Sequence, residues 1–308
     1  MKKAVIIGGR GKIGSYLVPS LIKNGYSVTN ISRGKTEPNI KDDIWKDVIQ
    51  LNLDRKQPGF EEEVAKLKAD AVFDMICFEN DEILKLIKAL RNSVSHYLVT
   101  GSVWIHGAGG AVPVVEDECR EPMEHYGIQK NLMEQTIVEE YKKNGFPGTI
   151  IHPGHIVCPG DIPINPQGNK SLEVYKTLKA GEPLYLANFG LETIHHVHAA
   201  DVAELFMAAL KAGKPSFGQG FHAVSPRAVT LQGYAKEVSA WYGKKADLKF
   251  EPFDIWKKRV SVTEADATYS HIMHSPNLSM QKAKDLLGFV PKYTSYEAVR
   301  ECLKSFGL

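Results

Sequence analysis

Short apolar runs alternate with amphipathic stretches along the first third of the chain. The runs that predict buried strands are residues 4–7, 26–32, 48–53, 71–76 and 96–100. Between them, apolar side chains recur at helical spacing, as at Ile83, Leu84, Ile87 and Leu90. Strands that alternate with amphipathic helices pair in parallel, with helices on both faces of the sheet. The pattern therefore predicts an α/β fold with a doubly wound parallel sheet.

A glycine-rich turn follows the first strand and precedes a helical pattern. A buried strand, a tight turn and a helix start form the arrangement in which backbone N–H groups and a helix dipole hold a pyrophosphate. Glycines let such a turn bend, approach the phosphate and pack the helix against the strand. A plain strand–loop–helix connection remains the alternative for a lone glycine triad. The cofactor-binding residues predicted in this turn are Gly8, Arg10, Gly11, Lys12, Ile13 and Gly14.

The pattern becomes less regular after residue 100. It predicts a long helix over residues 124–143 and a strand over 194–198 that returns to the sheet. We therefore expect a dinucleotide-binding domain over residues 1–160, together with a returning strand and helix near 191–212. The remainder, residues 161–308, is expected to be mainly a substrate-binding lid interleaved with the first domain.

Composition and charge are those of an ordinary globular protein. The chain has 308 residues, of which 43% are hydrophobic and 24% charged, and its formal net charge is +2. This balance gives no general attraction to nucleic acid or to an anionic membrane. Four scattered cysteines and the lack of a long apolar run after Met1 predict reduced thiols and a cytoplasmic location.

A tyrosine and a lysine stand one helical turn apart at Tyr126 and Lys130. A phenol with a pKa near ~10 is a poor base at neutral pH, and a fixed neighbouring cation lowers that pKa. Such a pair moves a proton to or from a hydroxyl while a nicotinamide moves the hydride. Ser102 follows the strand at 96–100 and should face the same crevice. The same spacing recurs at Tyr175 and Lys179, which we interpret as a surface helix feature.

Together these motifs resemble the extended short-chain dehydrogenase/reductase family, the NAD-dependent epimerase/dehydratase group. The resemblance extends over nearly the whole chain and implies a Rossmann fold. The residues that carry it are the GxxGxxG glycines Gly8, Gly11 and Gly14, the strand end at Ser102, the YxxxK pair Tyr126 and Lys130, Glu116 and Pro122 before that tyrosine, and segments 193–203 and 282–291.

The resemblance also implies roles for individual residues. Tyr126 would carry the proton, Lys130 would assist it and bind the cofactor ribose, and Ser102 would donate a hydrogen bond to the reacting oxygen. Pro153, after a strand predicted at 148–152, is included among the expected cofactor contacts. A homodimer built from the helices at 81–91 and 124–143 is implied as well.

The end of the second strand bears on the choice of cofactor. Enzymes that use NAD carry an acidic residue there, where it accepts hydrogen bonds from the ribose, whereas this chain has Ser32 and Arg33. Together with Arg10, Arg33 suits a 2′-phosphate, so NADP(H) is favoured and NAD(H) stays possible. Both arginines could instead be solvated or stack on adenine. Asp54 is expected either to contact adenine or to cap the next helix.

Missing arginines bear on the choice of substrate. Family members that act on nucleotide sugars clamp the diphosphate with arginines, and the corresponding segments here, 192–195 and 267–270, contain none. A standard nucleotide-diphosphate sugar is therefore doubtful. Trp104 suggests an apolar or sugar-stacking wall. His155 is expected to contact the substrate or else to be structural, and no metal site is expected among the histidines.

These observations predict an NAD(P)-dependent oxidoreductase or epimerase that transfers hydride reversibly at a secondary alcohol or ketone. The substrate would be sugar-like or another small molecule. One alternative is a nucleotide-sugar 4-epimerase or reductase. Another is a non-catalytic NADP-binding or RNA-associated member of the family, although no basic footprint for RNA is evident.

Overall fold

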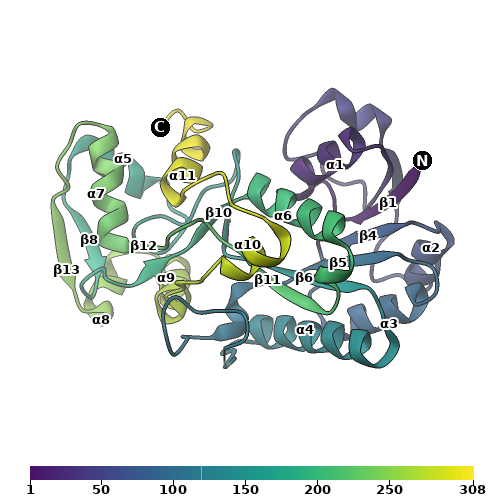
Figure 1. Cartoon of the computed structure of the whole chain (residues 1–308). Coiled ribbons are helices and arrows are strands. Elements are labelled where there is room, and N and C mark those ends of the chain that lie inside the picture. Colours follow the sequence, from purple (N-terminus) through teal and green to yellow (C-terminus); the bar gives the residue numbers. More distant parts are fainter. Residues whose placement is uncertain (119) are drawn as a thin grey trace.

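Seven parallel strands form the central sheet of the computed structural model, which describes residues 1–118 and 120–308 (Figure 1). Within that part of the chain the strand order is β11-β6-β5-β4-β1-β2-β3, with all pairings parallel. The sheet reverses its direction of growth at β1, which confirms the doubly wound arrangement. The strands are β1 Lys2–Ile7, β2 Tyr26–Ser32, β3 Ile49–Asn52, β4 Ala71–Asp74, β5 His96–Thr100, β6 Gly148–Pro153 and β11 Gln219–Ala223.

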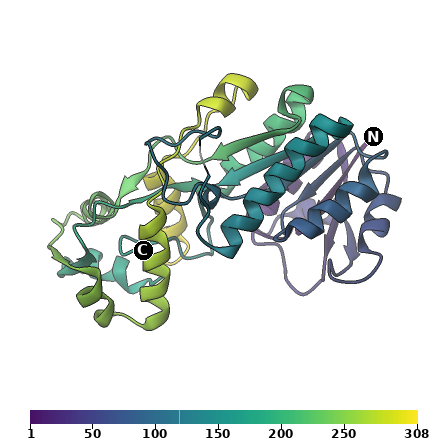
Figure 2. The same ribbon diagram turned by 90° about the horizontal axis from the view of Figure 1, so that it is seen from below.

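Helices cover both faces of this sheet (Figures 1 and 2). One face carries α1 Gly14–Lys23, α6 Ala199–Ala212 and α10 Gln281–Leu287. The opposite face carries α2 Phe60–Lys66, α3 Asn80–Leu90 and α4 His125–Asn144. Each layer buries its own hydrophobic cluster against the strands. The carboxyl ends of the strands therefore meet at one edge, where ligands bind in open α/β sheets.

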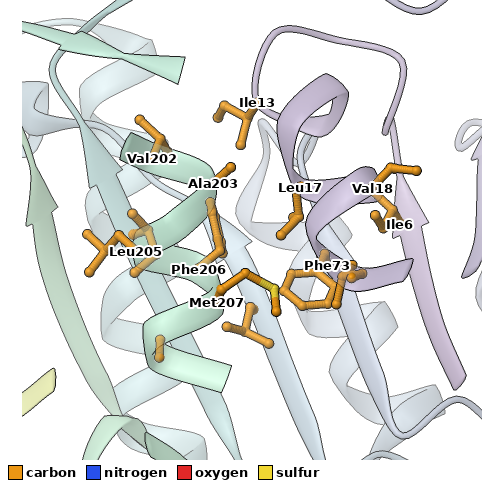
Figure 3. Close-up of a cluster of buried hydrophobic side chains, with 14 of the residues drawn as sticks. Ile6, Ile13, Leu17, Val18, Phe73, Val202, Ala203, Leu205, Phe206 and Met207 are labelled. Carbon is orange, nitrogen blue, oxygen red and sulfur yellow. The ribbon is translucent and has the colours of Figure 1, made fainter. Parts of the chain in front are cut away.

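Apolar packing keeps α1 helical through Pro19. The ring removes one backbone hydrogen bond and costs about 3 kcal/mol in a helix interior. Leu17, Val18 and Leu21 are fully buried on the same helix, and each such burial contributes about 2 kcal/mol. Figure 3 shows Leu17 on the side of α1 that faces α6, and Val18 beside Ile6 of β1. Burial therefore outweighs the loss at the proline.

A second group of elements has its own hydrophobic cluster, away from β1–β3 in Figure 1. Tyr175 lies fully buried in this cluster, and its hydroxyl is 2.8 Å from that of Tyr234. The interpretation of Tyr175 and Lys179 as a surface feature was therefore wrong for the tyrosine. The elements are α5 Glu173–Ala180, β8 Leu184–Ala187, α7 Leu231–Trp241, β13 Leu248–Glu251, α8 Phe253–Trp256 and α11 Ser295–Lys304.

The strand predicted over 194–198 does not return to the central sheet. This segment forms β9 Thr193–Ile194 and β10 His196–His198, which pair with β12 Val229–Thr230 and β7 His155–Val157. The seventh strand is instead β11, which pairs with β6. Its sequence, Gln-Gly-Phe-His-Ala, has little of the β-branched pattern that marks a buried strand. The helix expected after 194–198 does form, as α6.

Three short 3-10 helices precede or follow sheet strands: Asp43–Asp47, Val103–His106 and Lys214–Ser216. Helix α9 Val262–His274 follows another, Lys257–Arg259. Cys77, Cys158 and Cys302 are buried thiols, whereas Cys119 lies outside the described residues. No helix in the described ranges combines the length and apolarity needed to cross a bilayer.

Candidate active site

The glycine turn is shaped by steric limits at two of its glycines. Gly8 has φ +84°, and a Cβ there would lie 2.6 Å from Ile76. A Cβ on Gly14 would lie 2.1 Å from the carbonyl oxygen of Gly9, so the first turn of α1 packs directly on the backbone. A Cβ on Gly11 would have its nearest neighbour, the carbonyl oxygen of Gly8, at 3.6 Å, which is an ordinary contact distance. The turn is therefore closed toward the sheet and open at Gly11, as a phosphate cradle requires.

A cavity of about 450 Å³ begins at this turn and runs along the ends of β2 and β3. Arg10 reaches it from the turn, donating hydrogen bonds to the Thr36 carbonyl at 2.6 Å and to Gln50 Oε1 at 3.3 Å. Arg33 and Lys35 are exposed at its rim. The predicted residues that line this cavity are Gly8, Arg10, Gly11, Arg33 and Asp54.

The other residues predicted in the turn face elsewhere. Ile13 is buried at the N-terminal end of α1, and the Lys12 ammonium pairs with the Asp161 carboxylate in the loop after β7. Asp54 Oδ1 accepts a hydrogen bond from the Lys56 N–H at 3.0 Å, so it closes a turn. The cap of α2 is Gly59, not Asp54. Asp54 thus keeps only the adenine contact of its two predicted roles.

Sequence reasoning did not single out the buried ion pair between Arg55 and Asp74 at the floor of the cavity. Both guanidinium Nη atoms donate to the carboxylate, each at 2.6 Å. The Tyr97 hydroxyl donates to the same carboxylate at 3.1 Å. Asp74 is the last residue of β4, which is buried throughout. A charged residue at the end of a buried strand beside the glycine turn was the signal in the sequence that could have indicated this ion pair.

Ser102, Tyr126 and Lys130 converge beyond the end of β5. Ser102 caps the 3-10 helix Val103–His106, and its Oγ accepts a hydrogen bond from the Trp104 N–H at 3.2 Å. Tyr126 and Lys130 project from successive turns at the start of α4. The Lys130 ammonium lies 5.6 Å from the centroid of the Tyr126 ring. The structure therefore brings all three predicted side chains together.

The electrostatics of this group differ from the prediction. Burial raises the pKa of Tyr126, and its interaction with Ser102 only partly opposes that rise. Lys130 does not lower it, because its ammonium donates to the Cys77 and Thr100 carbonyls, each at 2.6 Å. Burial lowers the pKa of Lys130 itself to about 8. The expectation that Lys130 makes the Tyr126 phenol acidic is thus wrong for this structure.

Phe78 connects the cavity to this group. Phe78 lines the cavity. The centroid of its ring lies 5.0 Å from the Lys130 ammonium and 6.5 Å from the centroid of the Tyr126 ring. Pro153 ends β6 and is buried, and it does not line the cavity. The glycine turn, the cavity and the Tyr126 group therefore form a continuous surface at the carboxyl edge of the sheet.

Aromatic rings surround Tyr126 on the side away from the cavity. The Trp104 ring meets Tyr126 edge-on at 6.0 Å and stacks on His274 at 4.2 Å. His271 lies 5.8 Å from Trp104 and 4.9 Å from His155. The two predicted substrate residues, Trp104 and His155, are thus joined through α9. Sequence reasoning missed His271 and His274, whose i,i+3 spacing on a helix was the available signal.

A buried ion-pair network supports Ser102 from behind. Glu134 is 3% exposed and lies 2.5 Å from Arg120 Nη1 and 3.0 Å from His152 Nε2. The other ring nitrogen of His152 is 3.1 Å from both the backbone nitrogen and the carbonyl oxygen of Ser102. Although burial opposes ionisation, the interactions with His152 and Arg120 hold the pKa of Glu134 at about 2.

Glu116 and Pro122, the residues predicted before the tyrosine, lie in the same region. Glu116 is buried and accepts a hydrogen bond from the His222 N–H at 3.0 Å. A Cβ on Gly127 would lie 3.3 Å from Pro122. No group of three or more His, Cys, Asp or Glu side chains within the described ranges has the arrangement of a metal site.

Comparison with known proteins identifies the family. The model of the NAD dependent epimerase/dehydratase family matches residues 4–219. The chain belongs to this family. It is 26% identical over 314 residues to the chloroplast stem-loop binding protein of 41 kDa b from Arabidopsis thaliana, covering 97% of this chain and 78% of that protein. It is also 26% identical over 280 residues to vestitone reductase from Medicago sativa, covering 78% of this chain and 81% of that enzyme.

The fold matches the same family. The UDP-glucose 4-epimerase of Thermotoga maritima superposes with a TM-score of 0.75 at 18% identity, covering 99% of this chain and 98% of the epimerase. At that identity the likeness concerns the fold. This NAD dependent epimerase/dehydratase family member is an NAD(P)-dependent oxidoreductase or epimerase of the extended short-chain dehydrogenase/reductase type.

Proposed function

We propose that this enzyme transfers hydride reversibly at a secondary alcohol or ketone, with Tyr126 as the proton carrier. The observation that carries the proposal is the meeting of Ser102, Tyr126 and Lys130 beside the glycine cradle. The cradle fits a dinucleotide, because Gly8 and Gly14 leave no room for a Cβ while Gly11 is open. When bound, the nicotinamide supplies or accepts the hydride.

Each of the three side chains has a separate task in this proposal. The raised pKa of Tyr126 keeps its phenol protonated at neutral pH, which suits a proton donor to a carbonyl oxygen. Ser102 Oγ accepts from the Trp104 N–H, and its hydroxyl meets that of Tyr126, so in this proposal both hydroxyl groups turn to the same substrate oxygen. Lys130 has three N–H groups and uses two on backbone carbonyls, which leaves one for the cofactor ribose.

The cavity rim supports a preference for NADP(H) over NAD(H). Arg33 and Lys35 line it, and neither makes a hydrogen bond or ion pair with another described residue. We expect Arg33→Ala to weaken NADPH binding about tenfold, because a charge-assisted hydrogen bond to the 2′-phosphate is lost. NADH binding should stay the same. Fluorescence titration of the two cofactors measures both dissociation constants.

Lys66→Ala is the control for that titration, since Lys66 is an exposed cation on α2 that does not line the cavity. It should change neither dissociation constant. Tighter binding of NADH than of NADPH by the unaltered protein would contradict the preference. Equal losses for both cofactors in Arg33→Ala would mean that the arginine contacts a part common to the two.

The segments that carry diphosphate-binding arginines in relatives of the family offer none here. The first segment, residues 192–195, includes β9, which packs against α9, the helix that contains the second segment, residues 267–270. The Thr193 N–H donates to Ser275 Oγ at 2.9 Å. A desolvated diphosphate needs guanidinium partners. This supports a small substrate that is not a standard nucleotide-diphosphate sugar. A nucleotide-sugar 4-epimerase activity is the alternative.

RNA binding is a second candidate function, favoured by the likeness to the chloroplast stem-loop binding protein. The net charge of +2 gives no basic footprint for it. Gel-shift titration with a stem-loop RNA at physiological salt separates the two. Micromolar or tighter binding that Tyr126→Phe leaves unchanged would favour the RNA function, whereas Tyr126-dependent turnover favours the enzyme.

We also propose a homodimer through α3 and α4. Leu84, Ile128 and Leu132 are 43%, 41% and 36% exposed, and the last two share a face of α4. Leu132→Glu should convert a dimer to a monomer in light-scattering chromatography, because a charge would be buried in the interface. Leu286→Glu, at an exposed leucine on α10, is the control and should leave the mass unchanged. A monomeric unaltered protein contradicts the dimer.

A further inference from the structure

The imidazoles beside Trp104 have their tautomers set by backbone carbonyls. His271 Nδ1 lies 2.8 Å from the Gly168 carbonyl and 2.7 Å from that of Ala267. His274 Nδ1 lies 2.8 Å from the Ser270 carbonyl, and His196 Nε2 lies 3.0 Å from the Ile164 carbonyl. A ring nitrogen beside a carbonyl must carry the proton. In a neutral ring the second nitrogen is then an acceptor.

Several of the remaining ring nitrogens are buried without a hydrogen-bond partner of good geometry. They are His274 Nε2, His196 Nδ1 and both ring nitrogens of His155. A buried polar atom left unpaired costs about 1–3 kcal/mol, so their concentration in one place calls for a ligand. His155 contacts both His271 and His196, at ring distances of 4.9 Å and 6.4 Å. The cluster reaches Tyr126 through Trp104.

Burial keeps the rings of His155, His196 and His271 uncharged at neutral pH. It lowers the pKa of His196 to about 4, and it also lowers the pKa values of His155 and His271. The Lys170 ammonium, which also acts on His271, pairs with Asp161 at 3.1 Å. One nitrogen of neutral His155 carries a proton and donates, whereas its other nitrogen and His196 Nδ1 accept. Hydroxyl groups, which both donate and accept, match this set, whereas phosphate and carboxylate have no protons to give to the accepting nitrogens.

We infer that His155, His196, His271 and His274 form the substrate-binding wall of this enzyme and select a non-anionic polyol whose hydroxyl groups donate to them. The inference rests on the proposed hydride transfer at Tyr126. In the reducing direction, Tyr126 gives a proton to the carbonyl oxygen, and a bound nicotinamide would supply the hydride to the carbonyl carbon. The C=O group becomes CH–OH, and NADP⁺ is released. His155 contacts two other histidines of the wall and determines specificity.

The experiment compares three classes of ketone with NADPH as reductant: unphosphorylated ketoses, the phosphate esters of the same ketoses, and aromatic ketones without hydroxyl groups. We expect turnover of the unphosphorylated ketoses. His155→Phe keeps a ring but removes both polar nitrogens, so KM for the ketose should rise about tenfold or more. His155→Gln restores one donor and one acceptor and should recover part of that loss. NADPH affinity should be unchanged in both variants.

His125→Phe is the matched control, because His125 is an exposed imidazole at the start of α4, outside the wall. It should leave KM unchanged. Calorimetric titration of the ketose into NADP⁺-loaded Tyr126→Phe, with and without His155→Phe, gives the same comparison without turnover. An aminated ketose that binds better than the neutral one would show that the donors are ammonium groups, which also fits these acceptors.

The outcomes separate this inference from the function beneath it. If the protein turns over ketoses through Tyr126 but His155→Phe leaves ketose affinity unchanged, the wall is overturned and the hydride transfer stands. A preference for the phosphate esters or for the aromatic ketones overturns it in the same way. If neither NADPH nor NADH binds, or if Tyr126→Phe turns over as fast as the unaltered protein, the proposed function itself fails.

Discussion

Tyr126→Phe should lower turnover by about 10³-fold while leaving the fold and the affinity for NADPH intact. General acid catalysis by a positioned side chain contributes about 10²–10⁴ in rate, and the substitution removes only the hydroxyl that carries the proton. Phenylalanine keeps the Tyr126 ring, so its contacts with Phe78 and Trp104 remain. Oxidation of NADPH with the ketone panel, measured at saturating cofactor, gives kcat for both proteins.

Tyr175→Phe is the control for this substitution. Tyr175 begins the second YxxxK spacing in the chain, but its hydroxyl is buried beside Tyr234 in the other hydrophobic cluster. The variant should keep kcat and lose some thermal stability, because the Tyr234 hydroxyl loses its partner. A kcat for Tyr126→Phe within tenfold of the unaltered protein would mean that another group donates the proton.

Local sequence pattern was enough to predict the parallel sheet and the position of the glycine turn. Strand, turn and helix signals there all agree, and Gly14 has no room for a side chain in the structure. Ser102 was expected at the crevice because parallel strands end at one edge of the sheet, and its meeting with Tyr126 was implied by the family resemblance. Whether these residues carry the roles assigned to them stays a prediction for the Tyr126→Phe experiment.

Other features depend on tertiary packing and could not be predicted in this way. The strand β11 was missed because its partner β6 determines its place, and its own sequence has weak periodicity. The pKa of Tyr126 was predicted in the wrong direction, because burial raises it, while the Lys130 ammonium donates to the backbone carbonyls of Cys77 and Thr100. His271 and His155 are more than 100 residues apart in the sequence, and they meet only because α9 packs against the segment after β7.

Glu134→Gln should lower the free energy of unfolding by about 3 kcal/mol near neutral pH, because removing one charge from a buried ion pair leaves its partners uncompensated. The pKa of Glu134 gives the same size by an independent route. It stands at about 2 in the folded protein against an ordinary 4.5, and this difference corresponds to about 3 kcal/mol. Urea unfolding of both proteins measures the loss.

The stability difference between Glu134→Gln and the unaltered protein should depend on pH. Because folding lowers the pKa of Glu134, its stabilisation is complete above pH 4.5 and is lost as the pH falls toward 2. The difference between the two proteins should therefore shrink by about 1 kcal/mol between pH 7 and pH 3.5. Glu139→Gln, in an exposed pair with Lys143 on the same helix, should show neither the loss nor the pH dependence. A difference that stays constant with pH would mean that Glu134 acts through packing and that its charge is not what holds His152 against Ser102.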